Sequence, residues 1–176
     1  MSKSVKIEGI ILRKRVLKES DTSLVIFSRS LGKLWVTAKG VRQITSKRAG
    51  HLQTGSYISC ICRQSLGGLY IQQSTLISAL YSIKHDPPRL EAFTLSIFLL
   101  DRLLPDSLPE LEIYISFQLF IKKLASVSSE QVHDLFVLFV IKLLSDLGHH
   151  DGSILAWSEC RELCEKIIEE KLPSVS

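Results

Sequence analysis

Hydrophobic positions change their spacing near residue 80 of this 176-residue chain. Before that point, short apolar or alternating runs are separated by turns that contain glycine, which is the pattern of β-strands. The predicted strands are Val5–Leu12, Thr22–Ser28, Leu34–Ala38, Tyr57–Arg63 and Leu69–Thr75, with a bulge or bend at Gly9. In the fourth strand, Ile58, Cys60 and Cys62 share one face. Five short strands with glycine at the turns predict a small closed barrel.

Beyond residue 80 the apolar positions recur at helical spacing. Proline or glycine bounds each predicted helix: Pro87 to Leu104, Pro109 to Leu124, Ser128 to Leu147 with Gly148 after it, and Ser158 to Leu172 before Pro173. Ser128 with Gln131 three residues later resembles a capping box. The third helix is apolar on every side over Leu135–Ile141, which predicts a central position in a helical bundle. The fold class is therefore a β-barrel followed by an all-α bundle, with domains at residues 1–78 and 79–176.

Charge divides at the same place as the helical pattern. Residues 1–80 hold 13 Lys and Arg against three acids, a net of +10, whereas residues 81–176 hold 9 against 15, a net of −6. Seven of the nine glycines precede the division, and all five prolines follow it. Such a change indicates two domains with different partners, and the basic half suggests a polyanion.

Composition excludes several protein classes. Hydrophobic residues make up 45% of the chain, so it can form a core and is not disordered. The longest apolar run has seven residues, Leu135–Ile141, whereas a membrane-spanning helix needs about 20. No long apolar stretch follows the N-terminus, and four cysteines do not make a disulfide scaffold. We therefore expect a soluble cytoplasmic protein without a membrane partner.

The basic residues of the first half are candidates for contact with a nucleic-acid backbone. A twelve-residue connection, Lys39–Gly50, carries four of them and no acid, and a loop this long between strands often has a function. Trp35, Tyr57 and Tyr70 are candidate platforms for base stacking. The alternative is a solvated basic surface with Trp35 in the core. The predicted nucleic-acid-binding residues are Arg13, Arg15, Lys33, Trp35, Lys39, Arg42, Lys47 and Arg48.

The cysteines and histidines do not form a recognised metal or catalytic motif. Cys60 and Cys62 fit the barrel core, and Cys160 and Cys164 fit the apolar face of the last helix. Paired Cys-x2-Cys knuckles, a phosphate-binding Gly-x4-Gly-Lys loop and a Gly-x-Ser-x-Gly elbow are all absent from the sequence. We predict no metal, no cofactor and no enzymatic activity.

Several short motifs together resemble one family. They are Glu8–Arg13, Glu19–Asp21, Leu31–Leu34, Ala38–Arg42, Ser46–Arg48 and Leu52–Gln53, in the order and spacing of the bacterial RecO recombination and DNA-repair family. The later runs Leu99–Pro105 and Lys142–Gly148 are similar to its helical domain, more loosely. The resemblance implies an N-terminal oligonucleotide-binding (OB) fold.

The resemblance also implies a function. Members of this family are non-enzymatic recombination mediators that bind single- and double-stranded DNA and anneal complementary strands. With the partner RecR they help to load the RecA filament onto DNA coated by single-stranded-DNA-binding protein, which implies association with the nucleoid. Many members carry a Cys-x2-Cys zinc knuckle, whereas this chain has Cys160-x3-Cys164. We therefore expect a short member that lacks the zinc module.

Two alternatives remain open at the level of sequence. In the first, the chain is a protein-interaction adaptor whose barrel is mainly a scaffold, which the acidic and apolar helical half favours. In the second, it is a metal-dependent enzyme that uses His149, His150, Cys160 and Cys164.

Overall fold

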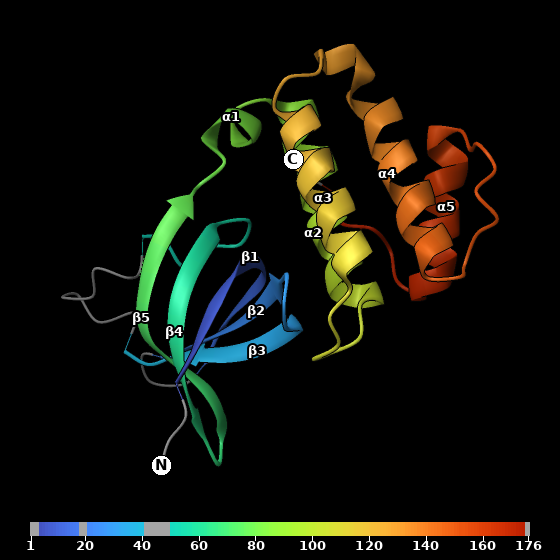
Figure 1. Ribbon diagram of the computed structural model, residues 1–176. Helices are drawn as coiled ribbons and strands as arrows, with labels where there is room; N and C mark the ends of the chain where they lie inside the picture. Colours follow the sequence, from blue (N-terminus) through green and yellow to red (C-terminus); the bar gives the residue numbers. More distant parts are fainter. Residues whose placement is uncertain (1–3, 18–20, 41–49, 175–176) are drawn as a thin grey trace. The chain divides into compact units, whose positions relative to one another are not determined.

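The computed structural model describes residues 4–17, 21–40 and 50–174, and the chain forms two units (Figure 1). The first unit comprises residues 1–80 together with residues 104–109. The second comprises residues 81–103 and 110–176. The sequence predicts a boundary between residues 78 and 79, and it gives no sign that a later segment returns to the first unit.

The first unit is a closed barrel of five strands. They are β1 (Ser4–Val16), β2 (Thr22–Ser28), β3 (Gly32–Ala38), β4 (Tyr57–Ser65) and β5 (Gly68–Ser78). Their order around the barrel is β1-β2-β3-β5-β4, and β4 closes it by pairing with β1. All neighbours are antiparallel except β3 and β5, which pair in parallel at Val36–Leu69 and Thr37–Tyr70. This is the five-stranded OB-fold, so the predicted fold class is confirmed.

Alternate residues of each strand fill the barrel core. Ile58, Cys60 and Cys62 of β4 point inward, as the sequence predicts. Leu52, in the connection before β4, is fully buried with them. The remaining core residues are apolar side chains of the other four strands: Ile7, Ile11, Leu24, Ile26, Leu34, Val36, Ala38 and Ile71.

Strand β1 is longer than predicted, and its irregularity lies at Leu12 rather than at Gly9. The β1–β2 register shifts between Ile11 and Arg13. There the Ile11 amide donates to the Ser56 carbonyl (3.0 Å), and the Gly55 amide donates to the Ile11 carbonyl (2.7 Å). These bonds extend the pairing of β1 with β4 beyond Ile10 and Tyr57 and satisfy the backbone groups of Ile11. Arg13 and Arg15 consequently lie within β1 rather than after it.

Gly9 has a different role from the predicted bulge or bend. A Cβ at this position would lie 2.3 Å from the Phe27 carbonyl oxygen of β2. The two strands therefore approach too closely for any side chain, and only glycine fits.

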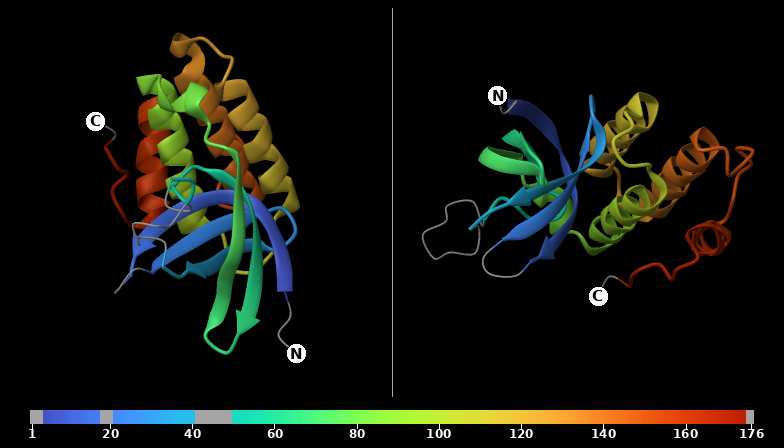
Figure 2. Two further views of the ribbon diagram at one scale, coloured as in Figure 1. Left: turned by 90° about the vertical axis from the view of Figure 1, so that its left-hand side faces the viewer. Right: turned by 90° about the horizontal axis from the view of Figure 1, so that it is seen from below.

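Strands β4 and β5 form a long hairpin whose turn projects from the barrel (Figure 2). Their pairing continues to Ser65 and Gly68, which leaves Leu66 and Gly67 as the turn. Leu66 is fully exposed.

The second unit contains five α-helices in its described residues. They are α1 (Tyr81–Lys84), α2 (Pro87–Leu103), α3 (Leu111–Leu124), α4 (Val132–Asp146) and α5 (Trp157–Ile168), with a short 3-10 turn η1 (Ser129–Gln131) before α4. Helix α4 packs against α2, α3 and α5 and is central, as predicted. Its Leu138 is nevertheless 60% exposed, so the apolar stretch is not buried on every side. None of the helices in the described part of the chain is long and apolar enough to cross a membrane.

The helix ends differ from the predictions in detail. The Ser128 hydroxyl donates to the Gln131 side chain (3.0 Å) and caps no backbone amide, so the predicted capping box does not form. Instead, the Glu159 carboxylate accepts the Ala156 amide (2.7 Å) at the start of α5. Helix α5 ends at Ile168, earlier than predicted, because Glu169 adopts the left-handed conformation at a φ of 55°.

Candidate nucleic-acid interface

The candidate cations of β3 lie in a single row on the outside of the barrel. Leu34, Val36 and Ala38 are buried in the core, so the alternate positions 33, 35, 37 and 39 face outward. This row places Lys33 and Trp35 at the beginning of the strand and Lys39 just beyond its end. The surroundings at the two ends of the row are very different.

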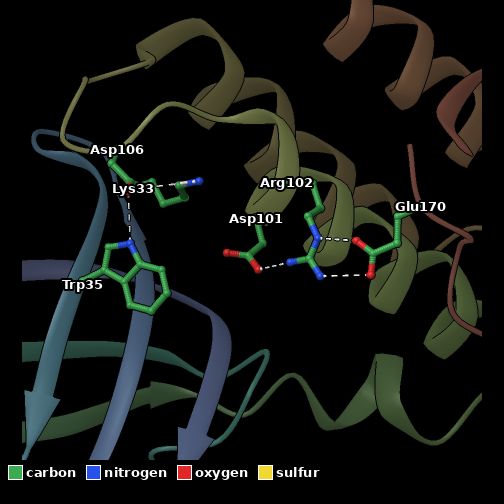
Figure 3. A network of polar contacts seen from close by, with 6 residues as sticks. All are labelled: Lys33, Trp35, Asp101, Arg102, Asp106 and Glu170. Atoms are coloured by element: carbon green, nitrogen blue, oxygen red, sulfur yellow. Dashed lines mark hydrogen bonds and ion pairs between the residues drawn. The ribbon is translucent and has the colours of Figure 1, made fainter. Parts of the chain in front are cut away.

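At the beginning of β3, residues 104–109 lie against the barrel and bind the candidate residues. Asp106 forms a parallel bridge with Lys33, and the Ser107 amide donates to the Lys33 carbonyl (2.8 Å). The Asp106 carboxylate accepts the Trp35 indole N–H (3.1 Å) and pairs with the Lys33 ammonium (3.3 Å), as Figure 3 shows. The approach is close, since a Cβ on Gly32 would lie 2.0 Å from the Leu108 carbonyl oxygen.

These contacts change what Lys33 and Trp35 can do. The Lys33 side chain is only 10% exposed, so Asp106 compensates its charge within the protein. The Trp35 ring stays 45% exposed, outside the barrel core, and the Arg13 guanidinium lies over it, 4.8 Å from the ring centroid. Arg13, Lys33, Trp35 and Asp106 therefore form one intramolecular cluster. Asp106 is 71 residues from Trp35 in the sequence, so no local pattern predicts this contact.

The other end of the row opens into a basic hollow. We call it the β5 hollow; its volume is about 370 Å³, and it is lined by Lys39, Arg63, Ser65, Tyr70 and Gln72. The Lys39 ammonium lies over the Tyr70 ring at 4.8 Å from its centroid. Three adjacent strands build the hollow, because Tyr70 of β5 pairs with Thr37 of β3 on one side and with Arg63 of β4 on the other.

The helical unit has a hollow of similar size but opposite charge. Its volume is about 390 Å³, and four glutamates and two lysines line it: Glu162, Glu165, Lys166, Glu169, Glu170 and Lys171. A phosphate would be repelled there, whereas the lining of the β5 hollow holds two cations and no acid. The contrast in net charge between the two halves of the sequence thus recurs in their surface hollows.

Several motif residues that the sequence analysis singled out stabilise the barrel. The Asp21 carboxylate accepts the Gly40 amide (2.9 Å), which joins the segment before β2 to the end of β3. Gln53 accepts a hydrogen bond from the Lys14 ammonium (3.0 Å). These contacts hold the connections of the barrel in place and explain why acids and amides occur between the basic residues.

The remaining predicted residues lie apart from the two clusters or outside the described chain. Arg15 is exposed near the end of β1, and Tyr57 is half-buried at the start of β4. Arg42, Lys47 and Arg48 lie outside the described residues. Arg63 and Gln72 are not among the predicted residues, although their outward positions follow from the alternation with buried Cys62 and Ile71.

The cysteines are buried thiols. Cys60 and Cys62 lie with their sulfur atoms 3.7 Å apart, and this hydrogen bond together with burial raises the pKa of Cys60. A hydrogen bond with Cys160 and burial raise the pKa of Cys164 in the same way. Across the described ranges, no three His, Cys, Asp or Glu side chains are placed to hold a metal ion, so His149, His150, Cys160 and Cys164 are not gathered into a site.

The comparison with protein families fits this barrel. Residues 1–80 match the family described as recombination protein O, N-terminal. Twenty-two curated proteins match the chain, and the relatives described below are all DNA repair protein RecO. The barrel therefore resembles the N-terminal part of RecO proteins.

The similarity to RecO proteins extends into the helical unit. RecO of Listeria monocytogenes serotype 4b is 30% identical over 146 residues, which are 81% of this chain and 55% of that protein. RecO of Thermoanaerobacter sp. is 26% identical over 82% of this chain and 58% of that protein. RecO of Alkaliphilus metalliredigens is 31% identical over 49% of this chain and 35% of that protein. The chain spans about half the length of the curated relatives it matches.

Solved structures resemble the chain only distantly. The Schizosaccharomyces pombe Stn1–Ten1 complex aligns with 44% of this chain and 59% of that one, at 19% identity and a TM-score of 0.35. The assignment of the OB-fold therefore rests on the strand pairing of the barrel itself.

Proposed function

We propose that this chain is a non-enzymatic DNA-binding mediator of DNA repair and recombination. Similarity of residues 1–80 to the N-terminal part of RecO, together with a basic OB-fold barrel, is the observation that carries the proposal. The barrel would hold single- and double-stranded DNA by its phosphates, since residues 1–80 carry a net charge of +10.

The arrangement of the barrel revises the proposed set of DNA contacts. Lys33 is excluded because Asp106 compensates its buried ammonium, and Arg13 is stacked on Trp35. Arg63 enters the set because it is exposed beside Lys39. The six proposed phosphate contacts are Arg15, Lys39, Arg42, Lys47, Arg48 and Arg63.

Strand annealing would require no catalytic group. Two DNA strands repel each other through their phosphates, and bound cations lower that repulsion while the protein keeps the strands close together. We further propose that RecR and single-stranded-DNA-binding protein are partners and that the chain assists loading of the RecA filament. An annealing assay on protein-coated single strands, with and without RecR, tests this part of the proposal.

The dependence of affinity on salt tests DNA binding directly. Six phosphate contacts predict a slope of roughly −4 for log affinity against log salt on a single strand. A labelled oligonucleotide followed by fluorescence anisotropy measures this slope, and a slope near zero would contradict the proposal.

A set of alanine substitutions tests the contribution of the Lys39–Gly50 connection. Replacing Lys39, Arg42, Lys47 and Arg48 together should weaken binding to unrelated sequences equally, because phosphate contacts carry no sequence information. The matched control replaces four exposed lysines of the helical unit: Lys122, Lys123, Lys142 and Lys166. Equal affinity of the two quadruple variants would remove this connection from the site.

A second candidate function is a protein-binding adaptor. Leu111, Ile115 and Leu119 of α3 are 44%, 38% and 54% exposed, and their spacing of four residues places them on one helix face. Capture of purified RecR that persists in high salt, combined with no DNA binding, would favour this function over the first.

A further inference from the structure

The β5 hollow combines the three chemical groups that a nucleotide requires. Lys39 and Arg63 supply positive charge for a phosphate, Tyr70 supplies an aromatic ring, and Ser65 and Gln72 supply hydrogen-bonding groups. Its volume of about 370 Å³ is near the lower end of the range for small-molecule sites, roughly 300–1,000 Å³. The hollow therefore has room for about one nucleotide.

The Tyr70 ring is accessible from the hollow. The Lys39 ammonium rests 4.8 Å from the ring centroid, so one face of the ring already accepts a partner from outside the barrel core. The neighbouring Ile71 is buried, which anchors this part of β5 while residues 70 and 72 face outward. The ring is thus held on a rigid strand and not on a loop.

The positions of the two cations complete the geometry. Lys39 follows β3 and Arg63 lies on β4, so they flank Tyr70, which lies on the intervening strand β5. Both side chains are exposed, so a phosphate can reach each of them from solvent. A phosphate would draw the Lys39 ammonium away from the ring, since a full opposite charge attracts it more strongly than an aromatic face.

We propose that the β5 hollow binds one unstacked nucleotide of a single-stranded nucleic acid, with its base on Tyr70 and its phosphate between Lys39 and Arg63. This inference rests on the proposed function and adds a preference to it. A duplex offers phosphates to the two cations but keeps its bases stacked inside the helix. Tyr70 therefore distinguishes single strands from duplexes, whereas Lys39 and Arg63 act on both.

Two probes of equal length test the inference by fluorescence anisotropy: a fluorescein-labelled oligothymidine and a labelled duplex. Tyr70→Ala should weaken single-strand binding at least about fivefold, because stacking of one base contributes strongly to affinity. Duplex affinity should change by less than about twofold, and Tyr70→Phe should retain single-strand affinity because it keeps the ring. Tyr70→Leu keeps apolar bulk without a ring and should behave like alanine, which guards against a loss caused by misfolding.

The charge variants provide the complementary measurement. Lys39→Ala and Arg63→Ala should each weaken binding to both probes. Each should also reduce the magnitude of the slope of log affinity against log salt on the single strand by about 0.7. Arg29→Ala is the matched control, because Arg29 is an exposed cation of the barrel that does not line the hollow.

The outcomes separate this inference from the proposed function. If wild type binds both probes and Tyr70→Ala weakens neither of them, or weakens both equally, the nucleotide site is wrong while DNA binding stands. If wild type binds neither probe, the proposed function itself fails. If Tyr70→Ala loses affinity for the single strand alone and Tyr70→Phe retains that affinity, the result supports the site.

Discussion

Replacing Asp106 by alanine tests whether residues 104–109 belong to the barrel. The change removes the acceptor of the Trp35 indole N–H and leaves the Lys33 ammonium, 10% exposed, without this partner carboxylate. Breaking a fully buried ion pair costs about 3–5 kcal/mol, and an exposed pair contributes about 0–1 kcal/mol. The Asp106 side chain is 57% exposed, so we place the loss of stability between these limits, at about 2 kcal/mol. For a chain of this length, that lowers Tm by about 4–8 °C.

Tryptophan fluorescence can follow thermal unfolding of the barrel alone. The chain has two tryptophans, Trp35 in the barrel and Trp157 in the helical unit, so a Trp157→Phe background reports on Trp35. In that background the Tm of Asp106→Asn should lie between those of the wild type and Asp106→Ala, because an amide oxygen still accepts the indole N–H but carries no charge.

The control for this experiment is Glu162→Gln, which removes one negative charge from an exposed position of α5. If Asp106→Ala melts at the same temperature as this control, residues 104–109 do not stabilise the barrel and the reasoning fails.

Three further predictions follow from packing and from pKa shifts. Gly9→Ala should lower the stability of the barrel by about 2–3 kcal/mol in urea unfolding, because its Cβ would overlap a carbonyl of β2. Gly50→Ala is the control: its Cβ would meet nothing within 4 Å, so its stability should stay near that of the wild type. All four cysteines are buried, so Ellman's reagent should react with none of them in the native protein at pH 8 and with all four in denaturant. At this pH an exposed thiol of ordinary pKa (about 8.5) does react, so the absence of reaction reports burial. The Lys171 ammonium and the Leu172 amide lower the pKa of Glu165, so their stabilising contacts are present above the ordinary carboxyl pKa and are lost as the pH falls through the lowered one. The protection of the Leu172 amide against exchange, measured relative to an unstructured peptide at the same pH, should therefore fall in acid, and Glu165→Gln should abolish that pH dependence.

The strands and the barrel core are predictable because strand alternation is a local signal. Ile58, Cys60 and Cys62 show their common face within five residues, and the structure places all three in the core. Helix α4 is similarly visible from its apolar spacing. The exposure of Leu138 is not visible, since it depends on which sides of α4 the neighbouring helices leave open.

The candidate site is harder to predict because chemically similar residues have different neighbours. Lys33 in β3 and Lys39 just beyond its end lie in the same outward-facing row, six positions apart, and the sequence offers no reason to separate them. They differ in what packs beside them, which is Asp106 for Lys33 and Tyr70 for Lys39. Both neighbours come from other parts of the chain, and alternation along β3 does not show which residue of another segment packs beside it.

The return of residues 104–109 to the barrel also determines when that unit can be completed during synthesis. The five strands leave the ribosome first, but residues 104–109 of the same unit follow only after all of α2 has been synthesised. Until then the beginning of β3 has no Asp106 carboxylate and no Ser107 amide beside it. A fragment that stops at residue 80 would remain permanently in this unfinished state, with an open strand edge that invites pairing with other chains. The shortest fragment expected to behave as an independent barrel therefore ends after Pro109 and must include α2.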